Sequence, residues 1–366
     1  MTRLVSQSKT GFFDQEDWNQ LKNNWSAWWA HELDRPLVMI QTRDETVAVK
    51  DAGEAPSFVS NLPLDMPFDQ VLERYESQIL QTRFHGDLFP KWWPNFGPGI
   101  AAGFLGGQVH TAPDTVWFTP GDTFEDCPIE QMTLDDLPGN RWWTHIQALT
   151  RAACERWAGK VAVAFTDIGG NLDILASLRD TQQALLDVMD APDEIERLVN
   201  RITKLWMNYY NQLDAIIRPS CGGTTPWAAI WSPKRCYMLQ CDFCYMISPA
   251  MFERFVLPDL TASCEALDHG FYHLDGIGAL PHVDMLLSIE KLRGIQWVPG
   301  DGQPTHRHWM DLLKKIIDAG KLCQIYVTAD DARAICNEIG GKGFALFITD
   351  AMTSVQADEL VKELTT

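Results

Sequence analysis

The stretch Phe271–Val298, FYHLDGIGALPHVDMLLSIEKLRGIQWV, decides the fold. It opens with an apolar run at Phe271–Asp275, continues through a helix-length segment at Pro281–Leu287, and returns to an apolar run at Gly294–Val298. An apolar strand, a helix and a second apolar strand in this order indicate a βαβ unit of a parallel sheet.

Similar apolar runs recur along the chain, bounded by Gly, Pro, Asp or Asn. They predict eight strands, over 36–41, 82–87, 161–167, 237–242, 271–275, 294–298, 324–328 and 344–349. Helices are expected over 68–80, 281–287, 305–319, 329–339 and 354–364. Eight strand–helix units favour a (β/α)8 barrel of the α/β class.

The chain shows no linker, repeat or low-complexity segment at which it could be divided, so residues 1–366 are expected to form one domain. A Trp-rich helical extension is expected within residues 1–35. Residues 90–126 are too long for a simple strand-to-helix loop and predict an excursion over the barrel mouth, with a second over 221–235.

Composition excludes several classes of function. With 30 Lys and Arg against 49 Asp and Glu, the net charge of −19 disfavours binding to nucleic acid or to an anionic membrane. Met1–Thr10 lacks the apolar core of a signal peptide and no apolar run reaches 18 residues, so a cytoplasmic protein is expected. Nine scattered cysteines favour reduced thiols.

Acidic side chains follow the predicted strands, and the carboxyl ends of barrel strands are where chemistry is placed. One such Asp after a strand often caps the next helix instead, and this alternative applies most to Asp350 and Asp167. Five in comparable positions predict an acidic active site, formed by Asp87, Asp167, Asp242, Asp275 and Asp350.

His273 and Asp275 are two residues apart on one strand, so both side chains face the same point. They could hold a divalent metal such as Zn²⁺, Mn²⁺ or Fe²⁺, with Asp350 and Cys241 as further ligands. Without a metal they could act as an acid and base together with Asp242 or Asp87. A buried structural His–Asp pair is the third possibility.

Cys241 and Cys244 form a C-x-x-C motif with no second pair elsewhere, so a structural zinc site is disfavoured. On a strand their odd separation would put them on opposite faces. Polar and aromatic residues in the excursions, after the third strand and at strand ends are expected to bind substrate or to pack as a lid: Trp93, Asn95, Asp167, Arg179, Trp231, Gln296 and Trp297. No phosphate-binding glycine motif follows a strand, so no nucleotide cofactor is expected.

Several segments resemble the uroporphyrinogen decarboxylase superfamily, which includes the porphyrinogen decarboxylases and the cobamide-dependent methyltransferases. The segment Ile247–Pro258, ISPAMFERFVLP, is similar to the family's "iSP..F.ef..P" helix. The resemblance continues through His273–Gly276 and Ile295–Gly300, includes His85–Asp87 upstream, and extends weakly over about residues 20–360.

The resemblance implies a (β/α)8 barrel acting on a small organic substrate, and a dimer. Arg35–Arg43 lacks the "P.W.MRQAGR" segment of the decarboxylases, so the methyltransferase branch is the closer one. In that branch a His-x-Cys pair and a later Cys bind zinc; here His273 matches the His, Asp275 replaces the first Cys, and Asp350 lies near the second.

The leading expectation is therefore metal-assisted methyl transfer, with zinc as cofactor and a corrinoid protein as partner. The rival is a metal-free decarboxylase in which Asp87 stabilises a protonated intermediate. A non-catalytic ligand-binding barrel is the third alternative.

Overall fold

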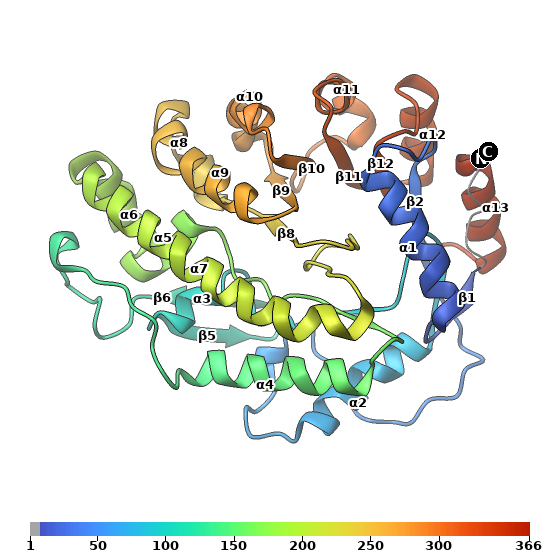
Figure 1. The fold of residues 1–366 in the computed structure, drawn as a ribbon, viewed down its shortest axis with the longest axis horizontal. Coiled ribbons are helices and arrows are strands. Elements are labelled where there is room, and N and C mark those ends of the chain that lie inside the picture. Colours follow the sequence, from blue (N-terminus) through green and yellow to red (C-terminus); the bar gives the residue numbers. More distant parts are fainter. Residues whose placement is uncertain (1–7) are drawn as a thin grey trace.

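The computed structural model describes residues 8–366. Most of the Met1–Thr10 segment considered above therefore lies outside the described residues. One large sheet has the strand order β1-β3-β2-β12-β11-β10-β9-β8 (Figure 1). Its strands are β1 Lys9–Thr10, β2 Leu37–Arg43, β3 Thr82–Gly86, β8 Cys236–Leu239, β9 His269–Asp275, β10 Leu292–Val298, β11 Leu322–Val327 and β12 Phe344–Ile348.

Six neighbouring strands of this sheet, β8 to β12 and β2, are parallel to one another. Their residues are almost all buried, as expected for a parallel sheet covered by helices. The strands predicted from the apolar runs at 36–41, 271–275, 294–298, 324–328 and 344–349 are all present in this group.

The strand predicted at 82–87 is present as β3, but it runs antiparallel to β2, with Met39 opposite Gly86 and Arg43 opposite Thr82. The cause is the preceding helix, α2 Phe68–Leu80. A single residue separates its end from the start of β3, and that start lies beside the carboxyl end of β2. The chain therefore enters β3 from that edge and leaves it at the opposite one.

The predicted strand at 161–167 is reduced to β7 Ala162–Val163, which pairs in parallel with β4 Lys91–Trp92 in a separate small sheet. Over residues 8–366 the hydrogen-bonded ladder of the large sheet ends at β1 and β8. The structure thus shows an α/β fold with a large central sheet, and its ladder is open where a complete (β/α)8 barrel would be closed.

Helices α8 to α12 line the outer side of strands β8 to β12, and α4 and α7 run side by side below them in Figure 1. Pro192 begins the 30-residue α7, and Gly222 ends it in the left-handed conformation (φ 64°). The α-helices are α1 Gln15–Trp29, α2 Phe68–Leu80, α3 Ala101–Phe104, α4 Arg141–Arg156, α5 Asn171–Arg179, α6 Thr181–Asp190, α7 Pro192–Cys221, α8 Pro249–Phe255, α9 Leu257–Ala266, α10 Val283–Ser288, α11 Met310–Asp318, α12 Ala329–Glu338 and α13 Ser354–Thr365.

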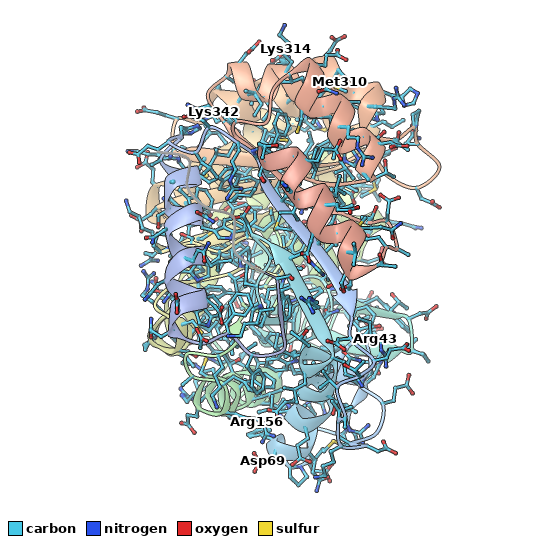
Figure 2. The ribbon with its side chains drawn as sticks, turned by 90° about the vertical axis from the view of Figure 1, so that its right-hand side faces the viewer. Arg43, Asp69, Arg156, Met310, Lys314 and Lys342 are labelled. Atoms are coloured by element: carbon cyan, nitrogen blue, oxygen red, sulfur yellow. The ribbon has the colours of Figure 1, made fainter. Side chains whose placement is uncertain are left out.

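The Trp-rich helix α1 covers the amino ends of the parallel strands. Trp28 donates its indole N–H to the carbonyl of Phe344 at the start of β12, and Arg293 near the start of β10 donates to the carbonyl of Trp29. Figure 2 shows α13 crossing in front of β2 and β3 at the side of the molecule. The carboxyl edge of the sheet is therefore covered by loops and not by these helices.

Residues 90–126 contain β4, the short helix α3 and a hairpin of β5 Gln108–Ala112 and β6 Thr115–Thr119. The short 3₁₀ helices are η1 Val59–Asn61, η2 Ile129–Gln131, η3 Asp242–Met246, η4 Ile277–His282 and η5 His306–Trp309. Within the described chain no helix combines the length and apolar character needed to cross a bilayer.

Candidate functional site

A row of three polar side chains, each from a residue within its strand, crosses β9, β10 and β11. The strand register puts Gln296 opposite both His273 and Gln324. Gln296 binds His273 Nδ1 through its Oε1 and donates from its Nε2 to Gln324 Oε1. Because an amide oxygen only accepts, His273 Nδ1 carries a proton, and its Nε2 is left for chemistry.

Two carboxylates interact with His273. Asp275, two residues further along β9, places its Oδ2 3.8 Å from the Nε2 of His273. Asp242 begins the turn η3 after β8, where removal from water raises the pKa of its carboxyl, the charge of His273 lowers it and that of Asp275 raises it. His273, Asp242 and Asp275 are therefore electrostatically linked, and we call them the His273 group.

Two further acids lie behind Asp242. Asp173 in the first turn of α5 accepts backbone N–H groups of Asp242 and Phe243 at 3.0 and 2.7 Å. Asp167 accepts the N–H of Gly169 at 2.8 Å. Burial, reinforced by the charge of Asp242, raises the pKa of both carboxyls to about 7.

The loop that carries these acids passes very close to the end of β8. A Cβ at Gly170 would lie 2.1 Å from the carbonyl oxygen of Gln240, so only glycine fits there. This approach brings Asp167 and Asp173 beside the Asp242 turn. Near neutral pH the two acids are partly protonated and can donate as well as accept protons.

We expect Asp167 to make the protein less stable as pH rises from about 4 to about 7. Its folded pKa lies above the unfolded value, so the folded state binds more protons in that window and loses up to about 4 kcal/mol across it. Asp167→Asn keeps an acceptor for Gly169 and should flatten this part of the profile. Denaturant unfolding at pH 5 and pH 8 measures the effect.

The exposed Asp114 supplies the control, because Asp114→Asn at the β5–β6 turn should leave the pH profile as in the wild type. Equal pH slopes for wild type and Asp167→Asn would show that the Asp167 carboxyl remains ionised in the folded protein.

Indole rings form one wall of the site. The rings of Trp227 and His273 pack in a T-shaped arrangement with centroids 5.0 Å apart, and the ring of Trp93 lies 6.3 Å from that of Trp227. Their buried indole N–H groups have no hydrogen-bond partner within residues 8–366.

Asp87 does not lie with the His273 group, contrary to the expectation that it sits at the active-site edge. It is fully buried at the amino end of β2, where its carboxylate accepts from Val38 N–H, Asn24 and the guanidinium of Arg35. The antiparallel direction of β3 explains this position, because the end of β3 lies at the opposite edge of the sheet.

Four residues expected to bind substrate also lie elsewhere. Trp231 contacts α1 through its backbone carbonyl, and Trp297 points away from Gln296 and packs on Trp309. Arg179 forms a buried ion pair with Asp187 at 2.8 Å. Asn95 bonds to the backbone of Ser57 and Gly97 and thereby holds a loop.

The four residues predicted as metal ligands are not assembled. Asp350 accepts the N–H of Ala329 at the start of α12, and Cys241 contacts the thiol of Cys244. The opposite-face prediction for these two cysteines is wrong, because η3 replaces the end of the predicted strand. In residues 8–366 no three His, Cys, Asp or Glu side chains are grouped so as to hold a metal ion.

Several residues of the site carried no distinctive sequence signal. Asp173 resembles any acid in a first helical turn, and Gln324 resembles any polar residue in a strand. Lys91 and Tyr326, which lie in a neighbouring cavity, were also missed. The alternation of polar positions in 324–328 is the one pattern that points to Gln324 and Tyr326 together.

Comparison with solved structures finds a methyltransferase from Methanosarcina mazei that has the same fold. It matches with a TM-score of 0.60 over 94% of this chain and 98% of that chain, at 12% sequence identity. At this identity the likeness establishes the fold alone. No family model matches the sequence, and no curated protein matches it.

Proposed function

We propose that this protein is an enzyme that transfers a methyl group, with its active site at the His273 group. The observation that carries the proposal is the orientation of His273. Its Nδ1 is held by Gln296, while its Nε2 faces Asp275 3.8 Å away. The fold shared with a methyltransferase supports the reaction class. The finer assignment to a modified (β/α)8 barrel of the uroporphyrinogen decarboxylase superfamily belongs to the same proposal.

The chemistry follows from the protonation states. In methyl transfer the acceptor atom forms a bond to the methyl carbon while the bond from that carbon to the donor atom breaks. For transfer from a corrinoid carrier, which departs without a proton, His273 Nε2 takes the proton of the acceptor, and the electrostatically linked Asp242 stabilises the resulting imidazolium. For transfer to the carrier, which brings no proton, the departing group of the donor needs one, and Asp173, whose pKa of about 7 keeps it partly protonated, supplies it through Asp242.

Zinc does not fit the arrangement of these residues, because a catalytic zinc needs three protein ligands and no three His, Cys, Asp or Glu side chains of residues 8–366 are grouped closely enough to supply them. No step of the proposed reaction passes through a metal. We expect the purified protein to contain well under one zinc per chain, with the same content in His273→Ala, when measured by elemental mass spectrometry. Stoichiometric metal that is lost in His273→Ala would contradict the acid–base scheme.

The partner that we propose is a corrinoid protein acting as methyl carrier, and a homodimer remains part of the proposal. The test is a spectroscopic assay with methylcobalamin and cob(I)alamin, which differ in colour, and a panel of methoxy, methylthio and methylamino compounds. Wild type should change the corrinoid spectrum with at least one donor. A corrinoid spectrum unchanged across the whole panel would count against corrinoid-linked transfer.

The decarboxylase alternative depended on Asp87 at the reacting centre. Asp87 is instead paired with Arg35 at the opposite edge of the sheet. No observation at the His273 group favours decarboxylation over methyl transfer.

A further inference from the structure

A cavity of about 310 Å³ lies at the carboxyl ends of β2, β11 and β12. Its volume is within the range of small-molecule sites. Most of its wall is apolar, and Lys91 supplies its one charged group. The lining includes Gln41, Phe84, Phe89, Lys91, Tyr326 and Phe347.

The positive charge of Lys91 has no carboxylate beside it in this cavity. Its Nζ donates to the carbonyl oxygen of Trp227 at 2.5 Å. Burial lowers the pKa of Lys91 to about 7, and no neighbouring charge contributes to the shift. The Lys91 ammonium is partly buried and no carboxylate lines the cavity, so an anion entering it would gain a strong charge-assisted hydrogen bond.

Two contacts join this cavity to the His273 group. The backbone carbonyl of Trp227 accepts from Lys91, and its ring packs against that of His273 in a T-shaped arrangement. Tyr326 lines the cavity, and its hydroxyl makes a side-chain contact with Gln296, the residue that orients His273. A molecule anchored at Lys91 would therefore lie beside the proposed reacting centre.

We propose that Lys91 binds the carboxylate of a small organic acid whose apolar body packs against Phe84 and Phe347. This assigns the substrate class of the proposed methyl transfer, and it rests on that proposal only for the role of the acid in the reaction. A monocarboxylate is favoured over a phosphate, because one amine in an apolar cavity matches one negative charge.

The test compares carboxylates with their uncharged amides by isothermal titration calorimetry at pH 6.5, using benzoate with benzamide and butanoate with butanamide. Wild type should bind at least one carboxylate about tenfold or more tightly than its amide, and Lys91→Met should lose that preference. Lys314→Met is the matched control, because Lys314 is exposed on α11 at the top of the molecule in Figure 2.

Equal binding of acid and amide by wild type, or a preference retained in Lys91→Met, would overturn the proposal. If Lys91→Met does not fold, reductive methylation of the wild type replaces it, and benzoate should slow modification of Lys91 but not of Lys314. His273→Gln should still prefer the carboxylate. That result would support the carboxylate site at Lys91 even if methyl transfer were disproved.

Discussion

Replacing His273 with glutamine should lower kcat for methyl transfer by about 10²-fold or more, because general acid–base groups contribute rates of this size. Glutamine retains a side chain that can bond to Gln296 but has no group that takes up a proton near neutral pH. The thermal midpoint should change by only a few degrees, since the His273 side chain is 16% exposed and contributes little to the core.

His308→Gln provides the matched control, because His308 is exposed on η5. It should retain the wild-type kcat. A large fall in thermal midpoint for His273→Gln, with residual activity in proportion to folded protein, would instead identify His273 as a structural residue of the sheet.

Asp242→Asn tests the neighbouring acid by the same assay. It should reduce kcat while leaving substrate affinity within a few-fold, since the carboxyl stabilises the imidazolium and relays a proton in the proposed reaction. Loss of affinity with unchanged kcat would assign Asp242 to substrate binding.

The second large effect concerns stability and falls at the other edge of the sheet. Arg35→Met should lower the free energy of unfolding by about 3–5 kcal/mol, because it leaves the carboxylate of Asp87 buried without a countercharge. The Arg35 and Asp87 side chains are 8% and 0% exposed and lie 2.7 Å apart. Denaturant unfolding of the whole chain measures the loss.

A double variant, Arg35→Met with Asp87→Leu, should recover part of that loss, because it removes both charges together. The exposed pair Lys342–Asp34 is the control, and Lys342→Met should cost less than about 1 kcal/mol. If Asp87→Asn abolished turnover while stability stayed as in wild type, Asp87 would have to be returned to the reaction.

Local sequence periodicity predicted part of the fold and part of the candidate site. The run of strands from β9 to β12 was predictable, because apolar strands separated by amphipathic helices have distinct periodicities. The shared face of His273 and Asp275 followed from strand alternation, and the two side chains do lie 3.8 Å apart.

Asp87 marks the limit of that reasoning. Its place after an apolar strand was correct, but the direction of β3 was not encoded in the strand's own residues. Direction depends on where the preceding connection delivers the chain, and one residue between α2 and β3 brings it to the carboxyl edge of β2. The expected active-site acid consequently became the partner of Arg35.

Sequence periodicity specified the α/β class, the positions of most strands and the one-strand pairing of His273 with Asp275, because these depend on neighbours within a few residues. The surroundings of His273 depend on distant segments. Strand register places Gln296 beside His273 and Gln324 beside Gln296. Asp242 reaches His273 from the turn after β8, and Asp173 holds that turn from the start of α5. Lys91 reached the adjoining cavity through a separate two-stranded sheet. Long-range packing sets such neighbours, since burial and charge act between side chains that are close in space, however far apart they are along the chain.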